Sequence, residues 1–161
     1  MTPTVKEIEL WIADIPDPEI PVITIKDLGI LRGVDYEDGN YEILITPTYT
    51  ACPAMQLIET QIKEVLSAKG VHNVKVNLTY SPAWTTDWLT EETKEKLRRY
   101  GVAPPRHSSC SKAYGAVQPK THCPRCNSIN TNLISRFGST ACKAYHKCNN
   151  CMETFEWFKC H

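Results

Sequence analysis

The sequence predicts an α/β protein of two modules: a small N-terminal domain with a mixed sheet and helices, and a C-terminal β module rich in cysteine. Three observations lead to this prediction. Helical and strand-like hydrophobic periods alternate over residues 5–100, and seven of the eight cysteines lie beyond residue 105. Charge also divides there, since residues 1–105 hold 10 Lys and Arg against 16 Asp and Glu, whereas residues 106–161 hold 8 against 2.

The N-terminal domain is expected to begin with a helix followed by a hairpin. Apolar side chains recur at helical spacing at Val5, Ile8, Ile12 and Ile15. The prolines of "PDPEIP" then stop the helix, because proline cannot donate the backbone hydrogen bond that a helix needs. The stretch "DLGILRGVDYEDGNYEILITPT" predicts two strands joined by a tight turn near Asp38 and Gly39.

A second helix, a strand and a third helix follow. Helical spacing returns at Met55, Ile58, Ile62 and Val65, and the alternation over residues 74–80 is typical of a half-buried strand. The third helix is expected over residues 90–100, capped by Thr90 and ended by Gly101. A strand–helix–strand crossover joins parallel strands, so the sheet should be mixed.

The expected boundaries are a domain over residues 1–101, a linker over 102–121 and a β module over 122–161. The linker is rich in Pro, Ser, Gly and Ala and shows neither hydrophobic period. The last forty residues contain too few aliphatic side chains to fold on a hydrophobic core alone. They therefore need a metal or crosslinks.

Two Cys-x-x-Cys pairs supply a metal site. "CPRC" (Cys123, Cys126) and "CNNC" (Cys148, Cys151) are separated by 21 residues, which is close to a zinc-ribbon pattern. Four thiolates suit zinc and also iron, and zinc is favoured because structural four-cysteine sites are its commonest use. The module is therefore predicted to be a zinc-ribbon-like β module folded around a structural zinc ion.

Two further cysteines of this module, Cys142 and Cys160, are expected at the end of the ribbon away from the zinc. They could meet each other there, or a thiol from elsewhere in the chain, to form a second metal or redox site. The alternative is two packed thiols, since free cysteine is among the most buried residue types.

Long ordered motifs resemble the PaaD family of the phenylacetate-degradation operon: "IPDPEIPVITIKDLGIL", "TPTYTACPA" and "SPAWTTDWLTEETKEKLRRYGVAPP", followed by "CPRC", "FGSTACKA", "CNNC" and "FKC". The N-terminal part also resembles the SufT-type iron–sulfur assembly factors. That resemblance implies an α/β domain whose Asp17-Pro18-Glu19 loop lies near a turn containing Thr48, Cys52 and Pro53. The resemblance to the PaaD family implies a partnership with the multicomponent phenylacetyl-CoA epoxidase, a di-iron oxygenase fed by a reductase that carries flavin and an iron–sulfur cluster.

Cys52 is the candidate metal or cluster ligand of the N-terminal domain. If Pro53 is the first helical residue, Cys52 is the N-cap, where the helix dipole lowers a thiol pKa. Asp17 and Glu19 would oppose a thiolate, but a bound metal would stabilise thiolate and carboxylates together. With Thr48, these residues are therefore predicted to form a transient iron or iron–sulfur site; a buried structural thiol is the alternative.

Three functions fit these features, and none is catalytic, because no histidine is paired with Cys52 and no triad or phosphate loop is present. The first is a metal or iron–sulfur maturation factor whose partners are epoxidase components. The second is a structural or electron-transfer subunit of the epoxidase. The third, a nucleic-acid-binding module, is disfavoured because the basic residues form no dense stripe.

The location of the protein is expected to be cytoplasmic. The N-terminal stretch carries Lys6, Glu7, Glu9 and Asp14 where a signal peptide needs an apolar block, and no segment has the ~20 apolar residues of a membrane span. No membrane partner is expected, and a homo-oligomer is allowed.

Overall fold

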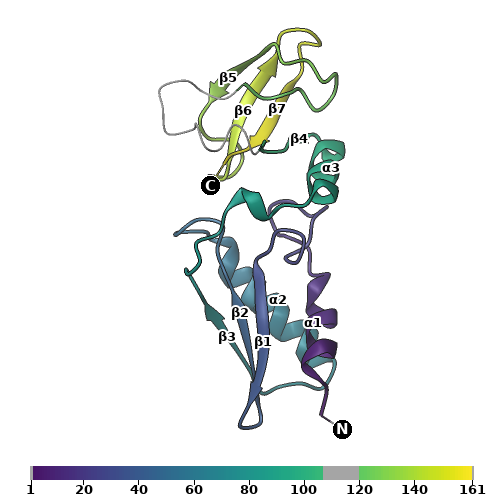
Figure 1. Ribbon diagram of the computed structural model, residues 1–161, viewed down its shortest axis with the longest axis vertical. Coiled ribbons are helices and arrows are strands. Elements are labelled where there is room, and N and C mark those ends of the chain that lie inside the picture. The colour runs from purple at the N-terminus through teal and green to yellow at the C-terminus, as the bar shows by residue number, and fades with distance from the viewer. Residues whose placement is uncertain (1, 107–119, 161) are drawn as a thin grey trace. The chain divides into compact units, whose positions relative to one another are not determined.

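The computed structural model describes residues 2–106 and 120–160, which divide into two compact units, residues 1–84 and residues 85–161. The prediction of an α/β protein with a mixed sheet and a separate β module is confirmed (Figure 1). Among the described helices, none combines the length and the apolar character that crossing a membrane requires.

The first unit contains two helices and a three-stranded sheet. Its elements are α1 (Val5–Ala13), β1 (Leu31–Glu37), β2 (Asn40–Ile45), α2 (Ala54–Ala68) and β3 (Val74–Leu78). The strand order is β1-β2-β3; β1 pairs antiparallel with β2, and β2 pairs parallel with β3. The hairpin turns at Asp38 and Gly39, which both have positive φ (50° and 81°), the backbone that a tight two-residue turn requires.

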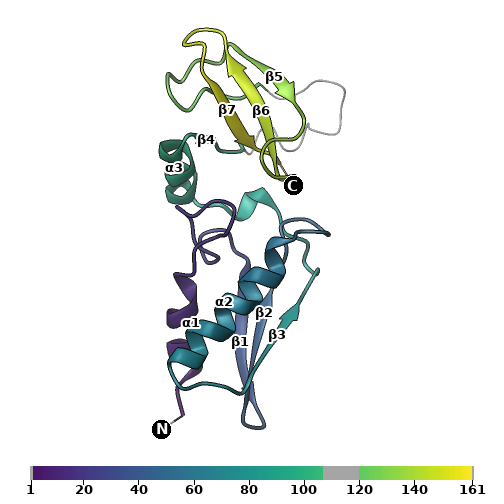
Figure 2. The ribbon, with the colours of Figure 1, turned by 180° about the vertical axis from the view of Figure 1, so that it is seen from behind.

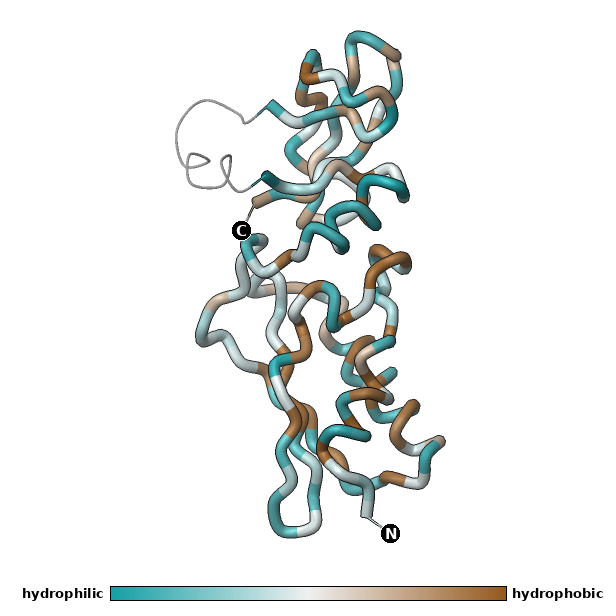
Figure 3. The backbone as a smooth tube through the Cα atoms, turned by 45° about the vertical axis from the view of Figure 1, so that its right-hand side comes forward, coloured by the Kyte–Doolittle hydropathy of each residue, from teal (hydrophilic) through white to brown (hydrophobic). Residues whose placement is uncertain are grey.

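Isoleucine dominates the core of this unit. Both helices cover one face of the sheet, as the opposite views in Figures 1 and 2 show. Tyr41, Ile43 and Ile45 of β2 alternate with partly exposed residues, so the buried side of the strand meets the helices. In Figure 3, hydrophobic and hydrophilic segments alternate along the backbone of this unit. The fully buried side chains include Ile8, Ile12, Ile20, Ile23, Ile25, Ile43, Ile58 and Ile62.

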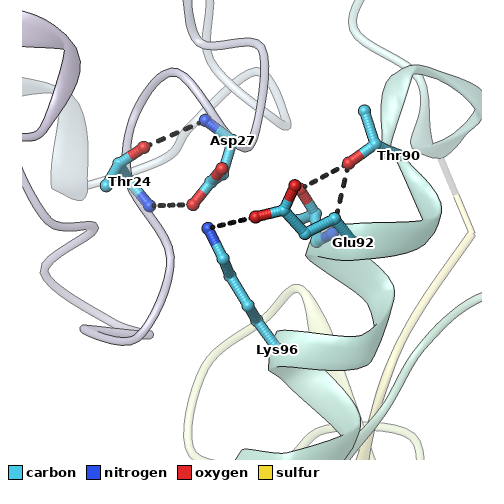
Figure 4. Close-up of polar contacts among 6 residues, drawn as sticks. Thr24, Asp27, Thr90, Glu92 and Lys96 are labelled. Carbon is cyan, nitrogen blue, oxygen red and sulfur yellow. Dashed lines mark hydrogen bonds and ion pairs between the residues drawn. The ribbon is translucent and has the colours of Figure 1, made fainter.

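The long connection between α1 and β1 is held by its own polar side chains. The Asp17 carboxylate accepts hydrogen bonds from the Glu19 and Ile20 backbone N–H groups at 2.9 and 2.8 Å. Thr24 and Asp27 bond reciprocally, each side chain accepting from the other's backbone N–H at 3.1 Å (Figure 4). These turns fix the loop that presents Asp17 and Glu19.

The second unit joins one helix to a four-stranded sheet. Its elements are η1 (Thr86–Trp88), α3 (Glu91–Tyr100), β4 (Val102–Ala103), β5 (Thr131–Ser135), β6 (Lys143–Cys148) and β7 (Thr154–Phe158), and the strand order is β4-β7-β6-β5. Thr90 caps α3 by accepting from the Thr93 N–H at 3.2 Å, and Glu92 pairs with Lys96 one turn on (Figure 4).

The division of the chain differs from the expected one. The first unit ends at Trp84 rather than at residue 101. Strand β4 pairs in parallel with β7, so β4 and the helix α3 that precedes it belong to the second unit. Val102 and Ala103, expected in a linker, are therefore buried strand residues. The part of that expected linker over 107–119 lies outside the described residues.

Candidate metal centres

Four cysteine sulfurs converge in the second unit. The Sγ atoms of Cys123, Cys126, Cys148 and Cys151 all lie within 4.8 Å of one another. Cys123 and Cys151 are 3.6 Å apart at sulfur, and Cys126 and Cys148 are 3.5 Å apart. With Zn–S bonds of about 2.3 Å, the sulfurs of a tetrahedral site lie about 3.8 Å apart. The donor set and its spacing therefore fit a tetrahedral zinc ion.

The backbone forms the two halves of this site in the same way. The N–H of each leading cysteine donates to the carbonyl five residues on, from Cys123 to Ser128 at 2.9 Å and from Cys148 to Glu153 at 2.8 Å. The residue after each second cysteine, Asn127 or Met152, has a left-handed backbone, with φ of 62° and 63°. Sequence reasoning had missed these two residues, although each directly follows the second cysteine of a pair.

Backbone N–H groups of the same loops affect the pKa values of the cysteine thiols. The backbone N–H of Cys151 and that of Asn150 donate to the Cys148 sulfur and lower its pKa to about 6, although burial opposes them. Burial raises the pKa of Cys123, which is 1% exposed, against donation from the Cys126 and Arg125 N–H groups. The N–H groups directed at these sulfurs are suited to thiolates, the form in which cysteine binds metal.

Cys52 lies in the turn that enters α2, one residue earlier than predicted. The helix begins at Ala54, and Pro53 rather than Cys52 occupies the N-cap position, with helical φ and ψ of −69° and −18° and no side-chain cap. The Cys52 carbonyl instead accepts from the Met55 N–H at 3.4 Å. The half-buried thiol receives hydrogen bonds from the Ala54 backbone and the Thr48 side chain.

The loop between α1 and β1 brings two carboxylates toward this thiol. Burial raises the pKa of Cys52, and the charges of Glu19 and Asp17 raise it further, against the Ala54 and Thr48 hydrogen bonds. Three of the residues predicted to share a site with Cys52, namely Asp17, Glu19 and Thr48, therefore each influence the pKa of its thiol. The expectation of a lowered pKa is not met, because burial and the two carboxylate charges outweigh the hydrogen bonds from the Ala54 backbone and the Thr48 side chain.

Cys142 and Cys160 do not form a disulfide with each other. Cys142 is a buried free thiol whose sulfur lies 3.1 Å from the Thr140 hydroxyl, whereas Cys160 is disulfide-bonded. Cys142 precedes β6 and Cys148 ends it, so Cys142 lies at the end of the strand away from the four-cysteine site, as expected. A second metal site shared by these two cysteines would require the Cys160 disulfide to be reduced first.

One aromatic residue near the unit boundary is structural. Trp84 is 5% exposed, and its indole N–H donates to the Leu28 carbonyl at 2.7 Å. This bond ties the end of the first unit to the loop before β1.

Comparison with known proteins covers both units. Residues 107–159 match the model of the PaaD zinc beta ribbon domain, and residues 6–81 match the model of the iron–sulfur cluster assembly protein family. A protein of Escherichia coli (strain K12), named as a candidate subunit of 1,2-phenylacetyl-CoA epoxidase, is 48% identical over 158 residues. The match covers 98% of this chain and 94% of that protein.

Two further relatives match the N-terminal part. An Fe-S protein maturation auxiliary factor of Porphyromonas gingivalis is 38% identical over 96 residues, covering 58% of this chain and 90% of that protein. A crystal structure of a domain of unknown function from Bacillus anthracis superposes with a TM-score of 0.53 at 26% identity, covering 58% of this chain and 90% of that one. The long match to the Escherichia coli protein and the match to the PaaD ribbon model together show that this chain belongs to the PaaD family.

Proposed function

We propose that the protein is a non-catalytic, cytoplasmic accessory factor of phenylacetate degradation, which helps a component of the phenylacetyl-CoA epoxidase to acquire or keep its iron or iron–sulfur centre. The observation that carries the proposal is the grouping of Cys52, Thr48, Asp17 and Glu19 in a domain that matches an iron–sulfur assembly family. The full-length relative, named as an epoxidase subunit, supports the pathway.

The Cys52 site suits a cargo that is bound transiently. One half-buried thiol with a raised pKa and two nearby carboxylates offers mixed sulfur and oxygen donors and far fewer thiolates than the four-cysteine site. Without metal, the carboxylates favour the protonated thiol; a bound cation reverses that balance and releases the proton. Binding coupled to proton release gives a site that can load and unload iron.

The four-cysteine site has a separate, structural role in this proposal. Cys123 and Cys148 belong to the core of the ribbon together with Ala103, Ala144, Phe155 and Trp157. A core this small needs the metal for stability, and zinc binding of about 10–16 kcal/mol would supply it. The ribbon is then a zinc-stabilised docking module, and the first unit handles iron.

The test is metal analysis with absorption spectroscopy on protein purified without oxygen, compared with Cys52→Ser. We expect about one zinc in both proteins and substoichiometric iron only where Cys52 is present. Cys142→Ser is the matched control, since Cys142 is also a free thiol outside the four-cysteine site. Absence of iron after reconstitution, with identical spectra for all three proteins, would refute the proposal.

A second candidate function rests on the name of the Escherichia coli relative, which is that of an epoxidase subunit. As a permanent subunit, the protein would remain in the active complex in equal proportion to the other components. As a maturation factor, it would be absent from the mature complex. Quantitative mass spectrometry of the purified active epoxidase separates the two.

A further inference from the structure

A groove in the second unit lies between the C-terminal end of α3 and the first cysteine pair. It has a volume of about 280 Å³ and belongs entirely to this unit. Three arginines, Arg98, Arg99 and Arg125, line it together with a single acidic residue, Glu153. The charged side chains that line the groove are therefore mainly positive, and the groove lies next to the four-cysteine site.

Glutamates orient these arginines without using all of their donors. Arg98 donates through Nε and a terminal nitrogen to both Glu95 oxygens, at 2.7 and 2.6 Å. Arg99 contacts Glu95 through Nε alone, at 3.0 Å, and Arg125 contacts Glu153 through one terminal nitrogen. Within the described residues, the other guanidinium nitrogens of Arg99 and Arg125 have no partner, and both side chains are more than two-thirds exposed (78% and 69%).

Apolar side chains complete the groove. Phe155 is 6% exposed and belongs to the ribbon core, and Pro124 and Tyr100 line the groove beside it. Tyr100 is half exposed, at 51%. Arginine and tyrosine around an apolar centre are the residue types that dominate binding energy at protein interfaces.

We propose that this groove is a docking site for an acidic segment of a partner protein, whose carboxylates pair with Arg99 and Arg125 while a small apolar side chain packs against Phe155. The inference rests on the proposed function in one respect, namely that this partner is the protein being matured. The planar fork of arginine matches a carboxylate in two-point hydrogen bonding, and Glu95 and Glu153 already hold two of the guanidinium groups in place for it.

Two features favour a peptide over a nucleic acid. The volume of about 280 Å³ suits one or two side chains rather than a continuous polyanion. Glu95 and Glu153 also interrupt the positive charge, whereas a nucleic-acid footprint needs an extended basic stripe.

The test is fluorescence anisotropy on the full zinc-loaded chain, with a labelled twelve-residue peptide of alternating Glu and Leu as the probe. We expect saturable binding that weakens at least about tenfold in Arg99→Glu and in Arg125→Glu, since each change removes a charge pair and introduces repulsion. Arg136→Glu is the matched control, because it makes the same charge change on an exposed residue of the ribbon outside the groove. It should bind within about twofold of the wild type if binding is local to the groove.

Arg99→Glu is the decisive variant, because Arg99 belongs to α3 and not to either cysteine pair, so zinc content should stay at the wild-type level. Equal binding by all variants, equal binding of a Gln-for-Glu peptide, or no binding at all would overturn the proposal. So would tighter binding of a single-stranded DNA of twelve nucleotides that is lost in the same variants. The Cys52-dependent iron content of each variant distinguishes the docking proposal from the proposed function. If only the docking proposal is wrong, the iron content is unchanged. If only the proposed function is wrong, peptide binding is unchanged.

Discussion

The Lys143 ammonium lies 3.0 Å from the Glu156 carboxylate across β6 and β7, and both side chains are largely withdrawn from solvent, at 4% and 17% exposed. Burial alone would raise the pKa of Glu156, but hydrogen bonds from Ser139 and Lys143 hold it below its usual value. The same carboxylate accepts from the Ser139 N–H at 2.5 Å. One buried ion pair thus fastens the turn before β6 to strand β7.

Gly138→Ala should destabilise the ribbon, because a Cβ at Gly138 would lie 2.5 Å from a Glu156 oxygen and displace the carboxylate. We expect loss of about 1–3 kcal/mol of unfolding free energy, since the Ser139 N–H and the Lys143 ammonium would each lose a partner. The measurement is denaturant unfolding of the zinc-loaded protein with zinc release as the ribbon signal. Gly33→Ala is the control, since its Cβ would meet nothing within 4 Å. Equal zinc-release midpoints for both variants would contradict the prediction.

The ion pair illustrates what the sequence could and could not predict. Local spacing sufficed for the four-cysteine site, since each pair lies within four residues, and the first pair precedes β5 while the second begins at the last residue of the neighbouring strand β6. Hydrophobic period sufficed for α1, α2 and the hairpin. Neither shows that Lys143 is buried, because lysine in an alternating strand is ordinarily exposed.

Non-local pairing explains the remaining differences. Strand β4 has only two residues, too few to show the alternation of a strand, and its partner β7 lies more than fifty residues further along the sequence. The Cys160 disulfide could not be predicted either, because disulfide connectivity cannot be deduced from the spacing of cysteines in the sequence. The approach of Glu19 to Cys52 was expected only from a family resemblance, since more than thirty residues separate them in the sequence.

The reactivity of Cys52 should shift toward alkaline pH. Burial and the charges of Glu19 and Asp17 raise its pKa, so the thiolate forms, and iodoacetamide reacts, only at higher pH than for an exposed cysteine. Glu19→Gln removes a negative charge and should move the alkylation midpoint to lower pH. Thr48→Val removes a hydrogen bond that favours the thiolate and should move it to higher pH.

Mass spectrometry of the peptide that contains Cys52, after timed alkylation of the zinc-loaded protein, gives each midpoint. The two variants act as controls for each other, because they change the same thiol in opposite directions. If both midpoints move the same way, or neither moves, Glu19 and Thr48 do not control the charge of Cys52.

His146→Leu should stabilise the ribbon. The imidazole is 3% exposed, and neither ring nitrogen has a hydrogen-bond partner among the residues that the structure describes. Burial lowers its pKa, so the ring is neutral and its desolvated nitrogens remain unpaired. Leucine keeps the volume and removes that penalty, which predicts a gain of about 1–3 kcal/mol.

The gain is offset in part by the loss of contacts with Phe155 and Trp157, whose ring centroids each lie 5.7 Å from that of His146. Denaturant unfolding at equal zinc content is the measurement. His72→Leu, at an exposed position, is the control and should change stability by less than about 0.5 kcal/mol. A variant at His146 less stable than the wild type would show that the imidazole has a favourable role in the core.

Removal of zinc should unfold the ribbon and leave the first unit folded. The ribbon core contains only a few apolar residues besides its own metal-binding cysteines, so loss of about 10–16 kcal/mol of metal binding exceeds what this core can replace. The first unit has its own isoleucine-rich core and no residue of the four-cysteine site. Hydrogen exchange after chelation should therefore show lost protection in β6 and β7 and retained protection in α2 and β2.

A substitution tests the same dependence without a chelator. Cys126→Ser removes the most exposed of the four ligands, so it should lower zinc content and reproduce the exchange pattern of the chelated protein. Cys142→Ser removes a buried free thiol outside the site and should keep both zinc and protection. Protection of β6 and β7 without zinc would mean that the ribbon is held by its side-chain packing and the Lys143–Glu156 pair. Loss of protection in α2 together with the ribbon would mean that the two units unfold as one.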